Sequence, residues 1–291
     1  MAFFAELLGV VLALRLAVVV EGMGGLLLAK KGRHPSMIHA LDHIVIAAPS
    51  VDAAVTDYRL LLGRRADGAS FQLANVRLDL RAHDGATGGG LSALAFAAGD
   101  MEKAQRLLQQ RALSITPADE GRQSRVLHIA PAATHGVGIS VLASRSGNGV
   151  PPLSPLESAE ETDAVASLDH VVIRSLNAER AVALYAGRLG LSLRLDRTEP
   201  KWGARLLFFR CGDLIIEIAH DLKAGIGDGP DRLWGLSWRV PDIAKAHARL
   251  QAACVDISEI RAGRRPHTRV FTARSHTAGV PTLMIGPDPQ T

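Results

Sequence analysis

One segment of this chain occurs twice without a gap, first from Leu41 to Gly63 and again from Leu168 to Gly190. Both copies open with Leu-Asp-His and a run of β-branched residues, which predicts a short buried strand. A helix should follow, because Val55, Tyr58 and Leu62 share one helical face and a glycine closes the segment. An internal duplication of this kind constrains the fold more than any single motif does.

A weaker repeat lies inside each half of the chain. Another strand and helix are expected in each half, followed by three extended segments separated by turns. The opening strands and their helices are Leu91–Phe96 with Met101–Arg111, and Leu233–Val240 with Ile243–Ala252. The clearest set of extended segments is Leu191–Arg197, Ala204–Arg210 and Leu214–Ala219. The sequence therefore predicts an α+β protein built from four strand–helix–strand–strand–strand units.

Length and composition agree with two globular domains. The chain has 291 residues, 47% hydrophobic and 21% charged, which is enough for two separate cores. The segment 144–166 is rich in Ser, Gly, Pro and acidic residues with no apolar period, as in a linker. We therefore expect a first domain at 38–143, a linker at 144–166 and a second domain at 167–287, after an apolar N-terminal extension at 1–37.

The N-terminal extension has three interpretations. Phe3–Ala29 is almost wholly apolar, but it contains Arg15, which is costly at the centre of a membrane helix. The basic residues Lys30 and Lys31 follow the apolar run, whereas a signal peptide carries its positive charges first. The segment is a membrane-proximal anchor, a helix packed on the protein or a partner, or an extension upstream of a start at Met37. We favour the last two.

Net charge and cysteine content indicate which classes of binding partner and which compartment to expect. The formal charge of +4, from 33 Lys+Arg against 29 Asp+Glu, is too diffuse for nucleic-acid binding and suits anionic small molecules. Cys211 and Cys254 form no metal motif and no disulfide framework. We expect a cytoplasmic protein that binds a small-molecule substrate and no nucleic acid, and we disfavour a membrane partner; a homodimer remains open.

Two ionisable residues stand alone in strands that are otherwise apolar. They are His170 in Leu168–Ile173 and Glu217 in Leu214–Ala219. Burying such groups is costly unless something pairs with them, and a divalent metal between them would satisfy both. The opposing interpretation is a buried His–carboxylate pair without metal.

The pattern resembles the vicinal oxygen chelate superfamily, which includes glyoxalase, methylmalonyl-CoA epimerase, extradiol dioxygenases and the bleomycin-resistance proteins. The resemblance rests on the two Leu-Asp-His openings, on helices that end in Leu-Gly, and on three further motifs. These motifs are Ile216–His220, Val240-Pro241-Asp242 and Thr134–Val137. It covers residues 38–143 and 167–287, and it implies two glyoxalase-like half-barrel domains, each a cup formed by two units.

The resemblance implies metal ligands on the first and last strand of each unit. In the second domain His170 and Glu217 match, whereas the other two positions fall on Gly235 and near Leu283. In the first domain His43 matches and Asp79 replaces the glutamate, whereas Ala93 and Ser140 occupy the remaining positions. Neither domain has a full set, so His220 or His276, water or substrate would have to complete a site at His170 and Glu217. The expected ion is Zn, Ni, Mn or Fe.

Further candidates come from the cup face and its rim. Arg239 shares strand parity with Gly235, so it either holds a substrate anion in the cup or pairs with an acid at the rim. Trp202 lies in a hairpin turn that can line the mouth, and His276 is a candidate substrate contact or a structural turn residue. Trp234 and Trp238 have the opposite parity to Gly235 and are expected in the core. The basic run Arg261–Arg269 is expected to be a solvated face.

For function, the sequence favours a glyoxalase- or epimerase-like metal-dependent lyase or isomerase acting on a small anionic carbonyl compound. In this hypothesis His170 and Glu217 bind the metal, and Glu217 is also the catalytic base. One alternative is a metal-free protein that sequesters a small molecule. The other is an extradiol ring-cleavage dioxygenase, whose resemblance would require two histidines and a glutamate in one domain.

Overall fold

The computed structural model describes residues 37–83, 89–119, 125–143 and 162–289. The predicted N-terminal extension and most of the predicted linker lie outside these residues. No helix in the described ranges is long and apolar enough to cross a membrane.

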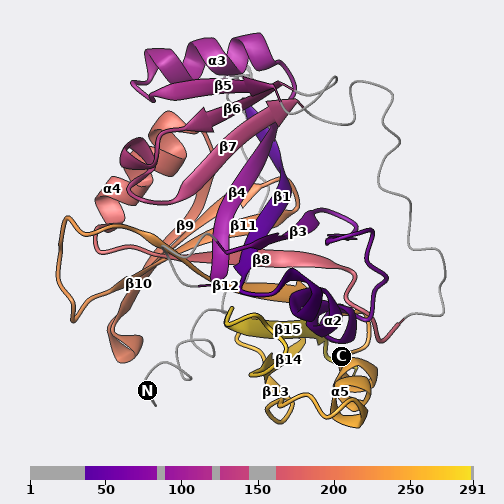
Figure 1. The fold of residues 1–291 in the computed structure, drawn as a ribbon. Coiled ribbons are helices and arrows are strands. Elements are labelled where there is room, and N and C mark those ends of the chain that lie inside the picture. Colours follow the sequence, from indigo (N-terminus) through magenta and orange to yellow (C-terminus); the bar gives the residue numbers. More distant parts are fainter. Residues whose placement is uncertain (1–36, 84–88, 120–124, 144–161, 290–291) are drawn as a thin grey trace, which may run out of the picture.

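The first half forms one mixed sheet with the strand order β2-β3-β1-β4-β7-β6-β5 among the described residues (Figure 1). Its first unit holds β1 (Ile38–Ala48), α2 (Val51–Leu62), β2 (Ser70–Gln72) and β3 (Arg77–Ala82). Its second unit holds β4 (Gly90–Ala98), α3 (Met101–Gln110), β5 (Ile115–Asp119), β6 (Arg125–Ile129), the 3₁₀ turn η1 (Pro131–Thr134) and β7 (Gly138–Ala143). The first unit thus has one strand fewer than expected in the part of the chain described.

The second half forms a second sheet with the order β13-β14-β15-β12-β8-β11-β10-β9. Its first unit holds β8 (Ser167–Arg174), α4 (Ala178–Val182) with the π-helical segment η3 (Ala183–Arg188), β9 (Ser192–Glu199), the 3₁₀ turn η4 (Pro200–Trp202), β10 (Ala204–Cys211) and β11 (Leu214–Asp221). Its second unit holds β12 (Arg232–Arg239), α5 (Ile243–Ala252), β13 (Arg261–Ala262), β14 (Thr268–Ala273) and β15 (Thr282–Pro287).

Both sheets follow the same pairing rule. The first strand of each unit runs parallel to the last strand of that unit, as in β1 with β3 and β8 with β11. The first strands of paired units run antiparallel, as in β1 with β4 and β8 with β12. The α+β class and the repeated βαβββ organisation are therefore confirmed, with the first unit one strand short in the part of the chain described. The exact domain boundaries remain predictions.

The Leu-Asp-His motif forms a β-bulge in both halves. Leu41 pairs with Phe96 and His43 pairs with Ala95, so Asp42 has no opposite residue on β4. The same irregularity leaves Asp169 without an opposite residue on β12. Because the extra residue shifts the alternation, the leucine and the apolar residue three positions later both face the core, whereas the histidine faces the other side.

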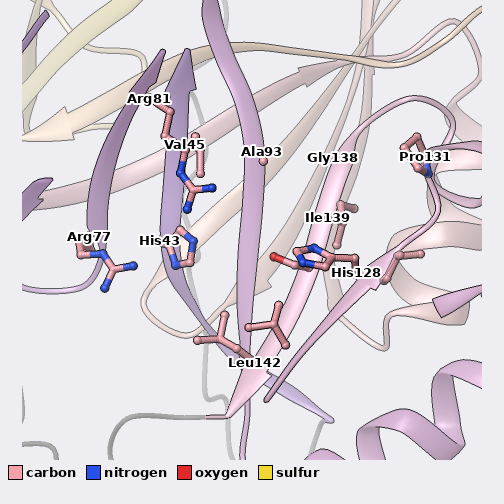
Figure 2. A pocket seen from close by; sticks show the side chains of 13 residues that line it. His43, Val45, Arg77, Arg81, Ala93, His128, Pro131, Gly138, Ile139 and Leu142 are labelled. Atoms are coloured by element: carbon pink, nitrogen blue, oxygen red, sulfur yellow. The ribbon is translucent and has the colours of Figure 1, made fainter. Parts of the chain in front are cut away.

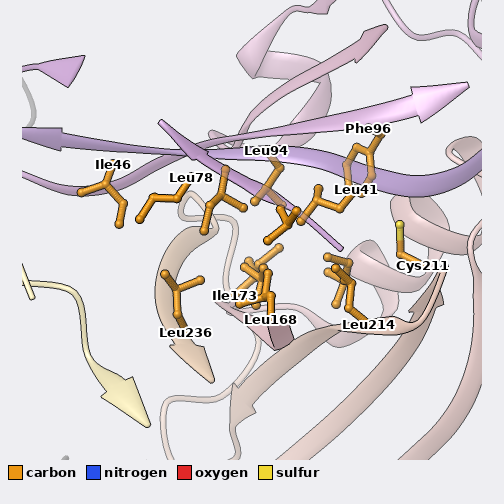
Figure 3. Close-up of a cluster of buried hydrophobic side chains, with 14 of the residues drawn as sticks. Leu41, Ile46, Leu78, Leu94, Phe96, Leu168, Ile173, Cys211, Leu214 and Leu236 are labelled. Carbon is orange, nitrogen blue, oxygen red and sulfur yellow. The ribbon is translucent and has the colours of Figure 1, made fainter. Parts of the chain in front are cut away.

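One apolar core joins the two halves (Figure 3). Leu41, Leu78 and Leu94 of the first sheet lie in the same buried cluster as Leu168 and Leu236 of the second. The helices cover the same cluster through residues such as Tyr58, Leu108, Tyr185 and Leu250. Each sheet therefore has one face in the shared core and an opposite face, which we call its cup.

Candidate functional site

His170 and Glu217 lie on neighbouring parallel strands of the second sheet and face its cup. Val172 is paired with Glu217, which places His170 two residues away on the same face of β8. The cup wall beside them is apolar and includes Val172, Ala204, Leu206 and Ala219, with Trp202, Phe208 and Trp234 packed against it. The two polar side chains are therefore set in apolar surroundings.

The two side chains converge without completing a hydrogen bond. Nε2 of His170 lies 3.7 Å from Oε2 of Glu217, and the side chains are 6% and 0% exposed. Nε2 of His170 and both carboxylate oxygens of Glu217 are buried, and no described residue is their hydrogen-bond partner. Buried polar atoms are normally satisfied, so this group of atoms requires a ligand, an ion or a proton.

Asp169 holds the other side of the imidazole ring. Its Oδ2 lies 2.6 Å from Nδ1 of His170, and its Oδ1 lies 2.5 Å from Nε of Arg239 and 3.3 Å from Arg265. Burial alone would raise the pKa of Asp169, but the contact with His170 and the two guanidinium groups hold that pKa below its usual range. An ionised Asp169 keeps a proton on Nδ1, which leaves Nε2 of His170 able to act as a ligand.

The pKa of Glu217 is shifted in the opposite direction from that of Asp169. Complete burial, and then the negative charge of Asp169, raise the pKa of Glu217 well above its usual value, and Arg264 opposes this. A carboxylate in such a place is stabilised only by a cation or by protonation.

The first domain carries a matching set of residues. Nδ1 of His43 lies 2.8 Å from Asp42, and its Nε2 lies 3.9 Å from Asp79 on the parallel strand β3. Val45 is paired with Asp79 just as Val172 is paired with Glu217, so the two sets occupy equivalent places. The carboxylates differ in one respect. Asp79 accepts hydrogen bonds from Ser70 and Arg77, whereas Glu217 accepts none from the described residues.

The strand registers also locate the other two ligand positions of each cup. Ser237 is paired with Leu283, which makes Gly235 the equivalent of His170 and Leu283 the equivalent of Glu217. By the same rule, Ala95 is paired with Ser140, which makes Ala93 and Ser140 the equivalents in the first domain. No group of three or more His, Cys, Asp or Glu side chains suited to a metal occurs in the described ranges.

The donor set of the second cup fits half of a divalent metal site. His170 Nε2 and a Glu217 oxygen are buried, near one another and without a hydrogen bond from the described part of the chain. Imidazole with carboxylate suits the ions expected from the sequence. Gly235 and Leu283 supply no side-chain donor, so substrate oxygens and water would have to provide the remaining ligands.

The structure does not bring His220 or His276 to this pair. His220 follows Ile216 and Ile218 on the core-facing side of β11, opposite to Glu217, and its Nδ1 lies 3.1 Å from the carbonyl oxygen of Ser175. His276 has a left-handed backbone, and its ring lies 2.9 Å from the Ser275 hydroxyl and 3.8 Å from Asp57 on α2. The expectation that either residue completes the site is therefore corrected. The left-handed backbone of His276 favours the alternative that this residue has a structural role in a turn.

Arg239 and Trp202 lie near the pair but contact other protein groups. The guanidinium of Arg239 binds Asp169 and Asp213, which is the arrangement expected for a rim arginine. Trp202 packs on the apolar wall of the cup, and Arg197 and Arg264 lie over its ring at 5.1 and 4.1 Å from the centroid.

The basic run 261–269, which we expected to be a solvated face, also contacts residues of the candidate site. Arg265 reaches Asp169, and Arg264 stacks on Trp202 close enough to affect Glu217. One nitrogen of Arg264 is buried without a hydrogen-bond partner among the described residues. Burial and the neighbouring Arg261 lower the pKa of Arg264 to about 10, so it is still a cation at neutral pH. Composition alone could not show that this hairpin folds back over the cup.

Trp234 was expected in the core with Trp238. Only Trp238 lies there, fully buried. The pairing of β12 with β8 passes from Leu233–Ile173 to Gly235–Val172, so Trp234 is a bulge residue and turns to the cup side.

Comparisons with known proteins agree with this geometry. Residues 169–272 match the family model described as the Glyoxalase/Bleomycin resistance protein/Dioxygenase superfamily. This match covers most of the second domain, and the fold is that of the vicinal oxygen chelate superfamily. A search among proteins of curated function found no significant match.

Solved structures share the fold over most of the chain. The 2,3-dioxygenase LapB from Pseudomonas sp. KL28 superimposes with a TM-score of 0.64 at 16% identity, covering 88% of this chain and 96% of that one. The Mn(II)-bound glyoxalase from Novosphingobium aromaticivorans gives 0.64 at 16% identity, with 86% and 83% covered. The 2,2',3-trihydroxybiphenyl 1,2-dioxygenase from Sphingomonas wittichii strain RW1 gives 0.62 at 16% identity, with 86% and 90% covered. At these identities the likeness establishes the vicinal oxygen chelate fold and not an activity.

Proposed function

We propose that the second domain is a metal-dependent lyase or isomerase of the glyoxalase or epimerase type, acting on a small anionic carbonyl compound. His170 and Glu217 would hold a divalent ion such as Zn, Ni, Mn or Fe. The observation that carries the proposal is a group of buried atoms, Nε2 of His170 and the two oxygens of Glu217, that have no hydrogen-bond partner among the described residues.

The residues of this chain then have separable roles. The bound ion would polarise a substrate carbonyl and make the adjacent C–H acidic. Glu217 has two oxygens, so one can ligate while the other accepts the proton. Asp169 orients His170 and, with Arg239 and Arg265, forms the network behind it. Arg264 and Trp202 cover the apolar cup and exclude water from Glu217, while the cation of Arg264 favours an anionic substrate.

Proton exchange tests this proposal directly. The full-length protein would be incubated in deuterated water with Zn²⁺, Ni²⁺, Mn²⁺ or Fe²⁺ and a set of small 2-oxo acids and their coenzyme A thioesters. We expect one ion and one substrate class to give deuterium incorporation next to the carbonyl, measured by mass spectrometry. Glu217→Gln should remove the exchange, whereas the matched variant Asp79→Asn in the first domain should retain it.

The contradicting result is exchange that is absent with every ion, or that survives Glu217→Gln. It would favour the second candidate, a metal-free protein that binds a small molecule. That candidate is supported by Gly235 and Leu283, which leave two of the four ligand positions without a side-chain donor. A ring-cleavage dioxygenase is less favoured, because Gly235 stands where its second histidine would be required. A cytoplasmic location and a homodimer remain predictions from the sequence.

A further inference from the structure

The cup of the first domain contains an open cavity of about 420 Å³ (Figure 2). Ligand sites for small molecules commonly have volumes of about 300–1,000 Å³, so the cavity is large enough for a compact organic molecule. The family model matches only residues 169–272, so it assigns no role to this domain.

The charge of the cavity lining has one sign. Of the described residues that line it, four are basic, namely His43, Arg77, Arg81 and His128, and none is acidic. The charge of Arg77 is already compensated, because its guanidinium donates to both oxygens of Asp79 at 2.7 and 2.9 Å. No acidic side chain in the described ranges pairs with Arg81 or His128.

This arrangement removes the need for a metal in the first cup. Both oxygens of Asp79 accept hydrogen bonds, from Arg77 and Ser70, whereas neither oxygen of Glu217 in the second cup accepts one from the residues that the structure describes. A carboxylate neutralised by a bidentate arginine attracts a second cation only weakly. The net positive charge that remains in the cavity favours an anion.

Most of the remaining lining is apolar and lies next to the basic residues, and Ser140 is its polar member. Val45, Ala93, Val126 and Leu142 line the cavity between the basic residues. In Figure 2, the guanidinium of Arg81 lies beside Val45 and near His43 on one side, whereas His128 lies on the other side, beyond β4. A ligand with a carboxylate and an apolar body matches both parts of this surface.

We propose that the first domain holds a separate, metal-independent site for a small organic carboxylate. Arg81 binds the carboxylate, the apolar body lies over Val45, Ala93 and Leu142, and His128 contacts the far end. The site does not depend on the metal or on the reaction proposed for the second domain.

Ligand-observed NMR on the full-length protein tests the site, with a chelator present to remove metal-dependent binding. The probes are benzoate, phenylacetate, salicylate and 4-methyl-2-oxopentanoate, each compared with its primary amide. We expect at least one carboxylate to bind, with its amide at least about tenfold weaker, since the amide lacks the charge that Arg81 recognises.

Four variants locate the site, two in the cavity and two as controls. Arg81→Gln should weaken binding of that carboxylate at least about tenfold, and His128→Gln should weaken it less. Both side chains are exposed, so melting temperatures should stay near that of the wild type. Arg106→Gln on the exposed face of α3 is the charge-matched control, and Glu217→Gln reports on the other cup. Both should bind as the wild type does.

Any one of four outcomes would overturn the proposal. The first three are no binding by any of the four carboxylates, equal binding by carboxylate and amide, and unchanged affinity in Arg81→Gln. Loss of binding in Glu217→Gln would also overturn it, because the ligand would then occupy the second domain.

Discussion

At the scale of single residues, the two cups differ in how a carboxylate is neutralised. Arg77 and Ser70 satisfy Asp79, whereas nothing in the described residues satisfies Glu217. The two domains share the strand pairing and the Asp–His contact, so this difference lies in a few side chains and not in the fold. Equivalent positions in a duplicated protein can therefore support different ligands.

The pH dependence of stability follows from Glu217 in the metal-free protein. Its pKa is raised by burial, so as pH rises above about 4.3 the unfolded state loses this proton before the folded state does. Stability is thus lost as pH rises toward the folded-state pKa. Glu217→Gln has no such loss, so with chelator present it should melt at a higher temperature than the wild type at pH 7.5. The difference should shrink toward pH 4, and equal melting at pH 7.5 would contradict the prediction.

Asp169 should act through His170. Asp169→Asn removes the charge that fixes the imidazole orientation, so metal affinity should fall by about 10- to 100-fold, measured by isothermal titration calorimetry. Asp42→Asn is the matched change in the first domain and should leave the metal affinity unchanged. An Asp169→Asn protein that is folded and binds metal as the wild type does would rule out this positioning role.

At the scale of elements, alternation and repeats predicted most of the strands and helices, and bulges account for the main errors. Ile243–Ala252 was predicted at its observed bounds, and Met101–Arg111 within one residue. Trp234 was misplaced because the bulge in β12 shifts the alternation, and this depends on the pairing with β8. The roles of Arg264 and Arg265 depend on how the β13–β14 hairpin folds back, which no local pattern records.

Close packing explains why Gly235, at the position equivalent to His170, carries no side chain that could bind a metal. A Cβ at this residue would lie 2.9 Å from the carbonyl oxygen of Pro281, so any side chain forces the backbone to shift. Gly235→Ala should therefore lower the free energy of unfolding by about 1–3 kcal/mol in chemical denaturation. Gly99→Ala, where a Cβ meets nothing within 4 Å, is the control and should have a much smaller effect. An equally stable Gly235→Ala protein would show that the strand adjusts freely.

At the scale of the whole molecule, the shared core should make the two halves unfold together. Leu94 of β4 and Leu236 of β12 lie in one buried cluster (Figure 3). Leu94→Ala and Leu236→Ala should each reduce stability by about 2–5 kcal/mol and lower one common transition in calorimetry. Two separate transitions, with each variant affecting only one, would mean that the halves are independent.

The central claim is that His170 and Glu217 form a divalent metal site in this protein. Thermal melts of the wild type and of Glu217→Ala, each titrated with Zn²⁺, Ni²⁺, Mn²⁺ and Fe²⁺, test it most directly. We predict that at least one ion raises the melting temperature of the wild type only, with a stabilisation of about 2.7 kcal/mol when the free ion is about 100 times the Kd. The claim is contradicted if no ion stabilises the wild type more than it stabilises Glu217→Ala.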